Sequence, residues 1–475
     1  MTATEFGSAC IQRKSGIYDF PGEPNEDCLY LNVYSPKSDN IAAMNLPVMV
    51  WIHGGSFTGG SGSEYKYNGT VLAASRDVVI VTINYRLGVL GYLADNAFCN
   101  EYQNCGMNGM LDQQMALNWV QGNIEYFGGN PNNVTIFGES AGAMSVGLHL
   151  ALPSSNGLFH KAVMESGMAE GYPSLDKALL VGNNVTAQLG CSNINSNDVM
   201  DCMRQQSTQD ILRAQLGYSW WPVINNYNLY QQPMAYLESG NYNQVPLLIG
   251  CNGNEGWLFT FFLYPPPISQ QEYEEIVFDN FGDFAPIVLN AYPLSDYDGS
   301  GYKAVEAIVG DYLFVCPAQF IVEATIEQNS LQQKTFMYLF NHTPSWSIPF
   351  VGPYHGAEIN FVFGFRPENN LIRFTPEERL LSDNMTAWWT DFAKHGRPSS
   401  YFNNDWPAYI PSTHERIVIT TDPPEYISSY KASQCEVWKE YYDLYYPTTD
   451  SDSLKQKMID SIQIHLDNQL MKVIL

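Results

Sequence analysis

Short apolar runs that alternate with helical patterns are the feature of this sequence that most restricts its fold. Runs without polar alternation are typical of strands buried on both faces. Helices between such strands indicate a mostly parallel sheet covered by helices on both sides. Strands are predicted at residues 46–52, 77–85, 133–137, 161–166 and 245–250, and helices at 111–124, with apolar positions at Met115, Leu117 and Val120, and at 141–152.

Composition and charge exclude several classes of protein. The 475-residue chain is 45% hydrophobic and 14% aromatic, which suffices for a large core and excludes a disordered chain. A net charge of -26 would repel nucleic-acid phosphates and anionic membranes, so we expect neither partner. We find no apolar run of about 18 residues, so no transmembrane span is expected.

Cysteines and glycosylation sequons indicate an oxidising, secretory compartment. The chain has nine cysteines and sequons at Asn68, Asn133, Asn184, Asn341 and Asn384. Residues 1–16 contain no apolar signal-peptide region, so we expect an incomplete or processed N-terminus on a secreted protein.

The chain lacks evident repeats and low-complexity linkers, and residues 1–445 are predicted to form a single domain. Segments 174–242 and 265–326 are expected to be helical excursions from the sheet. Residues 446–475 are expected to form a polar linker and an amphipathic helix, which would dock on this domain or mediate oligomerisation. Its apolar positions, four apart, are Leu454, Met458, Ile462, Leu466 and Leu470.

A candidate nucleophile lies in the stretch Gly138-Glu139-Ser140-Ala141-Gly142. An apolar strand runs directly into Gly138, and a helix follows Gly142, which is the context that a nucleophile elbow requires. The turn would hold the Ser140 side chain at the carboxyl end of the sheet, beside a helix N-terminus that favours negative charge.

The stretch WIHGGSFTGG, residues 51–60, is a candidate oxyanion-binding loop. It ends an upstream apolar strand, and Gly54, Gly55 and Ser56 could direct backbone N–H groups at a substrate oxygen. The N–H of Ala141 would complete the oxyanion hole. Alone, the stretch is equally consistent with an ordinary glycine turn; paired with the elbow, the catalytic interpretation is favoured.

A base and an orienting acid should follow the serine in the order acid, then histidine. Among eight histidines, His355 lies in a loop between aromatic residues. Glu255 follows an apolar strand in a glycine-rich loop, where catalytic carboxylates at strand ends are found. Each residue alone is also consistent with a structural role.

Six motifs together resemble the type-B carboxylesterase/cholinesterase family, in the family's order and from about residue 6 to residue 442. They are EDCLYLNVYSP, WIHGGSFTGG, NYRLGVLGYL, GMLDQQMALNWVQGNI, FGGNPNNVTIFGESAGAMSV and HGAEINFVFG. The resemblance implies an α/β-hydrolase fold and acyl transfer, with Ser140 as nucleophile, Glu255 as acid and His355 as base. It further implies oxyanion donors at Gly55, Ser56 and Ala141, and a structural pair between Arg86 and Asp112.

The cysteines fit the same family template. The resemblance implies disulfides Cys10–Cys28, Cys191–Cys202 and Cys316–Cys435, while a Cys99–Cys105 bond is left open and Cys251 is expected to be a buried thiol. Because Asn133 opens the strand before the elbow, we expect glycans at Asn68, Asn184, Asn341 and Asn384 instead.

Three departures from the family pattern qualify the resemblance. Ser56 replaces the third glycine of the oxyanion loop, and the family's usual first strands are missing ahead of Thr2, which would leave Glu26 without its arginine partner. The segment between Cys10 and Cys28 lacks the tryptophan with which cholinesterases hold choline, although a tyrosine could substitute through cation–π contact.

We therefore expect a broad-specificity carboxylic-ester hydrolase that acts on small-molecule esters without a cofactor or metal. Aromatics at 218–223, with Phe57, would line an acyl pocket or equally pack in the core. The alternatives are a catalytically impaired adhesion, coat or storage member of the family and, less favoured, a serine peptidase.

Overall fold

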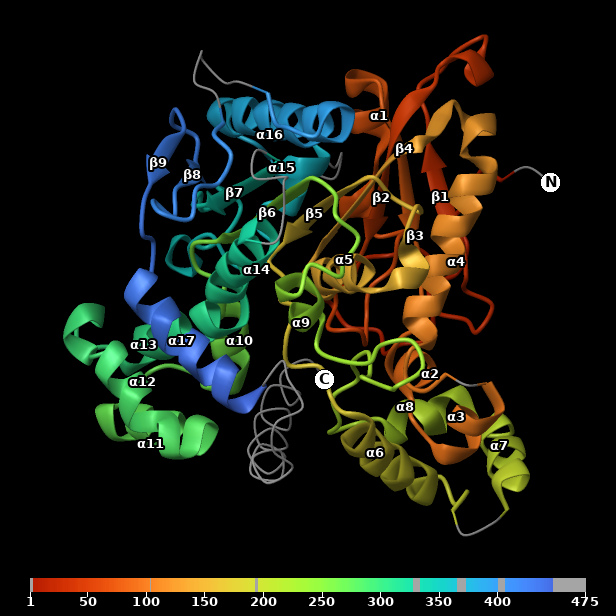
Figure 1. Cartoon of the computed structure of the whole chain (residues 1–475), viewed down its shortest axis with the longest axis horizontal. Coiled ribbons are helices and arrows are strands. Elements are labelled where there is room, and N and C mark those ends of the chain that lie inside the picture. Colours follow the sequence, from red (N-terminus) through yellow and green to blue (C-terminus); the bar gives the residue numbers. More distant parts are fainter. Residues whose placement is uncertain are drawn as a thin grey trace.

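The computed structural model describes residues 3–102, 104–192, 195–327, 334–364, 373–399 and 406–446. Within these ranges nine strands form one sheet in the order β1-β3-β2-β4-β5-β6-β7-β8-β9 (Figure 1). The pairings from β3 to β8 are parallel, and the edge strands β1 and β9 are antiparallel. The strands are β1 Leu31–Tyr34, β2 Leu46–Ile52, β3 Val79–Ile83, β4 Gly129–Glu139, β5 Lys161–Glu165, β6 Leu247–Asn252, β7 Thr335–Phe340, β8 Arg416–Ile419 and β9 Glu425–Ile427.

Side chains of β2 point alternately to the two faces of this sheet, and both faces are buried. Val48, Val50 and Ile52 belong to one buried cluster, and Met49 and Trp51 belong to a second cluster on the opposite face. Helices α4 and α5 contact the first face, while α16 contacts β2 and β4 from the other side. This arrangement is the predicted mostly parallel sheet with helices on both faces (Figure 1).

The helices follow the strands along the chain. The α-helices are α1 Thr70–Arg76, α2 Gly88–Tyr92, α3 Asn96–Tyr102, α4 Asn108–Asn123, α5 Ala141–Ala151, α6 Leu175–Gln188, α7 Ser196–Arg204, α8 Thr208–Ala214, α9 Pro233–Glu238, α10 Gly256–Leu263, α11 Gln270–Phe281, α12 Ala285–Ala291, α13 Gly301–Gly310, α14 Cys316–Glu327, α15 Ile359–Phe363, α16 Pro376–His395 and α17 Ala432–Tyr445. The shorter helical turns are η1 Ile41–Ala43, η2 Tyr65–Tyr67, η3 Ile124–Phe127, η4 Pro153–Ser155, η5 Gly282–Phe284, η6 Leu294–Tyr297, η7 Asp311–Val315, which is π-helical, and η8 Pro349–Val351.

Two helical excursions, α6–α8 and α11–α13, extend from the sheet in the lower half of Figure 1. Their buried side chains, for example Val185, Ile211 and Phe281, belong to the same apolar cluster as strand residues of the sheet. The excursions therefore share a hydrophobic core with the sheet. The predicted linker and helix at residues 446–475 lie outside the described residues, apart from Tyr446.

Helix α4 differs from its predicted pattern. It begins at Asn108, before the predicted start at 111, and Met115 is 65% exposed. It buries polar residues instead, because Asp112 receives two hydrogen bonds of 2.7 Å from the Arg86 guanidinium and one of 3.0 Å from the Arg86 backbone N–H. A bidentate guanidinium–carboxylate pair offsets the cost of burying the carboxylate.

Four disulfides close loops in the described residues. The structure bonds Cys10 to Cys28, Cys99 to Cys105, Cys191 to Cys202 and Cys316 to Cys435, and Cys251 is a buried free thiol. The Cys316–Cys435 bond joins α14 to α17 across 119 residues of sequence.

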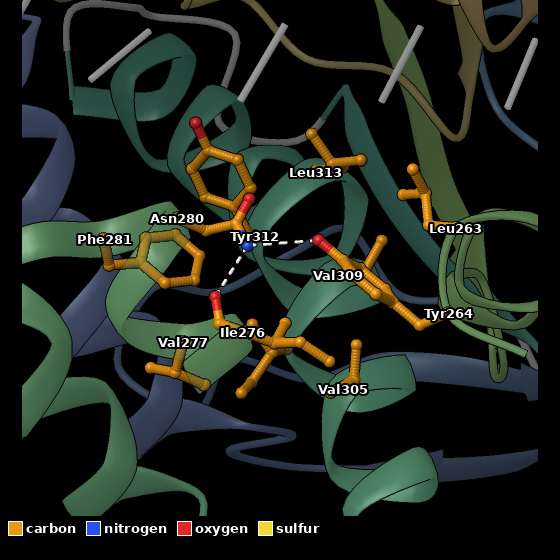
Figure 2. Close-up of a pocket in the computed structure, with 11 residues that line it drawn as sticks. Leu263, Tyr264, Ile276, Val277, Asn280, Phe281, Val305, Val309, Tyr312 and Leu313 are labelled. Carbon is orange, nitrogen blue, oxygen red and sulfur yellow. Dashed lines mark hydrogen bonds between the residues drawn. The ribbon is translucent and has the colours of Figure 1, made fainter. Parts of the chain in front are cut away.

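Within the described residues, one helical stretch, Gly301–Glu327, is long and apolar enough to cross a membrane, with a mean hydropathy of 1.5. Its most apolar window is 83% buried inside the protein, so it is a core helix, and the fold offers no integral span in these residues. The cavity in Figure 2, between α10, α11 and α13, measures about 40 Å³, which is too small for an ester substrate.

Candidate active site

Ser140 lies in the sharp turn between β4 and α5 that the sequence predicted. Its φ of 57° and ψ of -124° are unfavourable for a residue with a side chain. The flanking glycines are required by packing, because a Cβ at Gly142 would lie 2.0 Å from the carbonyl oxygen of Ile52, and one at Gly138 would lie 2.6 Å from the same atom. The strained turn therefore projects the Ser140 side chain beyond the carboxyl end of the sheet.

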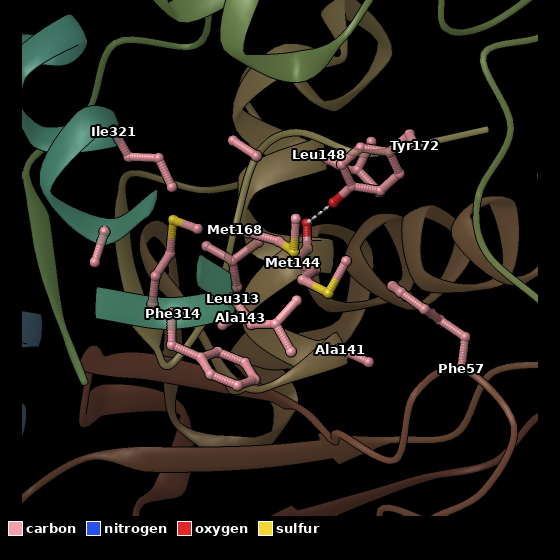
Figure 3. Close-up of a cluster of buried hydrophobic side chains, with 14 of the residues drawn as sticks. Phe57, Ala141, Ala143, Met144, Leu148, Met168, Tyr172, Leu313, Phe314 and Ile321 are labelled. Carbon is pink, nitrogen blue, oxygen red and sulfur yellow. Dashed lines mark hydrogen bonds between the residues drawn. The ribbon is translucent and has the colours of Figure 1, made fainter. Parts of the chain in front are cut away.

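Helix α5 anchors this turn in the core. All of its residues are buried, and Figure 3 shows Ala141, Met144 and Leu148 among apolar side chains from other elements. The Tyr172 hydroxyl adds a hydrogen bond of 3.2 Å to the carbonyl of Met144. Packing of this extent compensates for the backbone strain at Ser140.

The predicted oxyanion loop lies directly against the elbow. A Cβ at Gly54 would lie 3.1 Å from the Ser140 Cβ and 2.7 Å from the Glu139 carbonyl oxygen. Gly55 and Ser56 have φ values of 107° and 51°, and both line the same cavity as Ser140. Ser56 thus adopts a left-handed conformation in which glycine carries no steric penalty.

His355 and Glu255, which are 100 residues apart in sequence, form a short hydrogen bond. His355 Nδ1 lies 2.6 Å from Glu255 Oε2. The other oxygen of this buried carboxylate accepts hydrogen bonds from the Ser166 hydroxyl at 2.5 Å and from the Asn252 backbone N–H at 2.6 Å. These contacts fix the orientation of Glu255 and hence that of the imidazole ring.

Ser166 is a site residue that the sequence interpretation missed. It follows β5 with a φ of 57°, a second strained residue at a strand end beside the elbow. Its backbone N–H donates to Gly250, while the Ser140 N–H donates to the adjacent Glu165 carbonyl. A serine directly after an apolar strand was the available signal, but only the fold brings it to Glu255.

The second ring nitrogen of His355 differs from the expected arrangement. His355 Nε2 lies 3.2 Å from Glu139 Oε1, without the alignment of a hydrogen bond, and it has no hydrogen-bond partner among the described residues. The imidazole therefore contacts the residue preceding Ser140, and its Nε2 forms no hydrogen bond with the serine hydroxyl.

Charges around His355 determine its protonation. Burial lowers its pKa, but the carboxylates of Glu139 and then Glu255 act more strongly in the opposite direction, and the net result raises the pKa from 6.5 to about 9. Burial likewise raises the pKa of Glu358 to about 8, assisted by repulsion from Glu139 and Glu255. Burial also raises the pKa of Glu139, while the raised pKa of His355 favours the protonated imidazolium.

The elbow, the loop and His355 line a cavity of about 310 Å³, and Glu255 lies behind the imidazole. The aromatic wall of the cavity comes from α10 and from the 354–360 segment. Phe259 and Phe314 lie 5.1 Å and 4.5 Å from the His355 ring, measured between centroids, and they exclude water from it. The described residues contain no cluster of His, Cys, Asp and Glu that could hold a metal ion.

The segment 218–223 does not line this cavity. Trp220 is 3% exposed, and Trp221 packs 6.1 Å from the Phe57 ring, measured between centroids. Both tryptophans line a separate cavity of about 140 Å³, together with residues of α6. Trp220 therefore packs in the core, which was one of the two alternatives. The prediction that segment 218–223 lines an acyl pocket next to Ser140 is not supported.

A strained serine turn at the carboxyl end of a mostly parallel sheet, beside a histidine–carboxylate pair, is the arrangement typical of α/β hydrolases. Comparisons with known proteins agree. Residues 1–438 match the model of the carboxylesterase family. The chain is 33% identical to the acetylcholinesterase of Electrophorus electricus over 92% of its own length and 79% of that protein.

Two further relatives extend this result. Identity to the human cocaine esterase is 34%, covering 89% of this chain and 76% of that one. Among solved structures, a PNB esterase superposes with a TM-score of 0.77 at 33% identity, covering 92% of this chain and 89% of the other. The chain therefore belongs to the carboxylesterase family, has the α/β-hydrolase fold, and is an enzyme that acts on carboxylic esters.

Proposed function

We propose that this enzyme hydrolyses a broad range of carboxylic esters through a Ser140–His355–Glu255 triad and an acyl-enzyme intermediate. The observation that carries the proposal is that His355, held by a 2.6 Å hydrogen bond to Glu255, lines the same cavity as Ser140 in its strained turn. A nucleophile, a base and an orienting acid need this arrangement, which supports the proposal.

The proposed reaction begins when His355 Nε2 takes the proton of the Ser140 hydroxyl. The serine oxygen attacks the ester carbonyl, and the N–H groups of Gly55, Ser56 and Ala141 stabilise the oxyanion. The protonated imidazole then gives its proton to the departing alcohol, and water resolves the acyl-enzyme in the same way. Glu255 stabilises the imidazolium in both steps.

This reaction requires the His355 ring to exchange its contact with Glu139 for one with Ser140. The required movement is small, because Glu139 and Ser140 are adjacent and both line the cavity. Loss of the imidazolium proton to solvent leaves a neutral ring, which removes the attraction to Glu139 and favours this exchange.

Specificity for choline esters is not part of the proposal. The loop closed by Cys10 and Cys28 contributes Ile17 and Tyr18 to the cavity wall, where cholinesterases use a tryptophan. Tyr18 packs tightly, because a Cβ at Gly59 would lie 2.2 Å from its ring. A tyrosine face attracts a quaternary ammonium less strongly than a tryptophan face does.

A fluorophosphonate probe tests the nucleophile directly. We expect a single adduct on Ser140 by peptide mass mapping, and Ser140→Ala should lower kcat on p-nitrophenyl butyrate by about a million-fold. Ser75→Ala is the control, because it removes an exposed hydroxyl on α1 away from the cavity and should retain the adduct on Ser140. Labelling at another serine would overturn the role of Ser140, and no labelling of folded protein would support the non-catalytic alternative.

We further propose that the protein is secreted and glycosylated. Four disulfides are consistent with an oxidising compartment. Asn184 and Asn341 are exposed, and Asn68 and Asn384 are half-buried. The Asn133 side chain accepts a hydrogen bond from Lys161, which supports excluding Asn133 from the expected glycosylation sites. Intact mass before and after glycosidase treatment tests for glycans at these sites. Sedimentation tests whether the chain forms oligomers, one of the two roles expected for residues 446–475.

A further inference from the structure

We propose that Lys66 is a specificity-determining residue that makes the catalytic cavity select neutral esters over cationic ones. The inference rests on the proposed function, because it concerns the substrates of the Ser140 site. Its evidence is separate from the triad and comes from the charges on the cavity wall.

Lys66 belongs to η2, and its side chain lines the same cavity as Ser140 and His355. The ammonium lies 3.3 Å from Glu64 Oε2 and 5.0 Å from the centroid of the Tyr67 ring. These two contacts hold a lysine side chain, which is usually mobile, in one place at the wall.

The paired carboxylate does not face the substrate. Glu64 is only 2% exposed in its side chain and is absent from the cavity lining, and it also accepts a hydrogen bond of 3.2 Å from the Ser61 backbone N–H. Lys66 is 33% exposed in its side chain, so the charge presented to a bound molecule on this wall is positive.

The positive charge of Lys66 matters because Glu139, on the same cavity, carries the opposite charge. Its carboxylate also lines the cavity, 3.2 Å from His355 Nε2, and would attract a cationic substrate group whenever the His355 ring is neutral, as the proposed reaction requires. Burial lowers the pKa of Lys66, but Glu64 and Glu139 raise it to a net value above its ordinary range, so Lys66 is charged at neutral pH. Lys66 therefore opposes the field of Glu139 where the substrate binds.

The size of the effect follows from the size of the cavity. A cavity of about 310 Å³ is roughly 8 Å across, so a cationic substrate group inside it lies within that distance of the ammonium. Two unit charges about 8 Å apart, at an effective dielectric constant of about 20 to 40, change an equilibrium constant by roughly 5- to 30-fold. Repulsion of this magnitude is sufficient to set specificity.

The test compares two isosteric substrates that differ in charge, butyrylcholine and 3,3-dimethylbutyl butyrate. For each variant we measure the ratio of kcat/KM for the cationic ester to that for the neutral ester, which cancels effects common to both. We expect Lys66→Met to raise this ratio at least about fivefold. Lys66→Arg, which keeps the charge, should leave the ratio within about twofold of the parent value.

Two further variants sharpen the result. Glu64→Gln keeps an acceptor for the Ser61 N–H but leaves the ammonium uncompensated, so it should lower the ratio. Lys334→Met removes an exposed lysine just before β7, at the end of the sheet opposite Ser140, and should leave the ratio unchanged. An unchanged ratio in Lys66→Met, or an equal rise in Lys334→Met, would overturn the proposal.

Failure of the proposed function is distinguishable from failure of this inference. If the parent hydrolyses neither ester, calorimetric dissociation constants for choline and 3,3-dimethylbutan-1-ol replace the kinetic ratio, with thermal unfolding as the folding check for each variant. A Lys66→Met protein that binds choline no better, relative to the neutral alcohol, refutes the role of Lys66 even without turnover.

Discussion

Replacing Glu139 with Gln should lower the pH at which this enzyme becomes active. His355 must be neutral to act as a base, and its pKa of about 9 predicts that kcat/KM of the parent rises with pH, with a midpoint near 9. Among the groups that raise this pKa, Glu139 acts most strongly. Glutamine preserves the volume of the side chain but removes its charge.

The magnitude follows from the geometry of the contact. Opposite unit charges 3.2 Å apart, at an effective dielectric constant of about 20, attract by roughly 5 kcal/mol, which is an upper bound of about 4 pH units. The net rise of His355 is smaller, about 9 - 6.5 = 2.5 units, and several carboxylates share it against the cost of burial. We therefore expect the midpoint to fall by about 1 to 2 units, or roughly 1.4 to 2.8 kcal/mol.

The assay is kcat/KM for p-nitrophenyl butyrate between about pH 6 and 10, with hydroxylamine-free buffers of constant ionic strength. The stability of the fold gives an independent reading, because a raised histidine pKa contributes stability that is present below about 6.5 and lost as pH rises through about 9. In Glu139→Gln that loss should occur at lower pH. An unchanged or higher midpoint in both measurements would refute the reasoning.

Three further substitutions test other parts of the structure. Ser56→Gly should raise the unfolding free energy by about 1 kcal/mol, measured from the thermal midpoint, because the φ of 51° carries no penalty in glycine; a lower midpoint would contradict this. Replacing both Cys316 and Cys435 with Ser should cost about 4 kcal/mol, since their bond closes a loop of 119 residues; unchanged urea denaturation would argue against it. Asp112→Asn should cost about 2 kcal/mol, less than for a fully buried pair because the Arg86 side chain is 39% exposed; equal midpoints would show that the pair is not stabilising.

Strands β2 to β6 could be predicted because they contain continuous apolar runs. The predicted strand at 46–52 coincides with β2, and the predicted helix at 141–152 matches α5 to one residue. Strands β1, β7, β8 and β9 have no counterpart among the predicted strands. The four residues of β8 are too few for a periodic signal, and a buried Arg416 opens it.

Helix α4 shows how a helix can be predicted correctly while its buried face is predicted wrongly. The apolar residues Met115, Leu117 and Val120 suggested one buried stripe, yet Met115 is exposed, and Asp112 and Gln113 are buried. Buried polar residues need partners, and those partners, Arg86 and the Ser145 hydroxyl, come from other segments. Hydrophobic periodicity contains no information about them.

In the site, likewise, the identity of the candidate residues could be predicted from sequence, but their contacts could not. Chain order and loop context were enough to single out Ser140, Glu255 and His355 as candidates. The directions of their side chains were not predictable, because they depend on contacts between segments: Ser166 orients Glu255, and Glu139 attracts the second nitrogen of His355. Local sequence specifies which groups are present, whereas the tertiary fold specifies which atoms meet.

Glu139 also connects the pH dependence to the choice of substrate. Its position next to the nucleophile fixes its charge near the reacting carbonyl, where it raises the pKa of His355. The chain can adjust the effect of this charge on substrates only from another segment, and η2 does so with Lys66. Removing Glu139 should therefore weaken binding of cations and lower the pH midpoint together, whereas removing Lys66 should strengthen binding of cations. Opposite effects on the same substrate ratio, with a large shift in pH midpoint in only the first variant, would separate the field felt by the substrate from the field felt by the base.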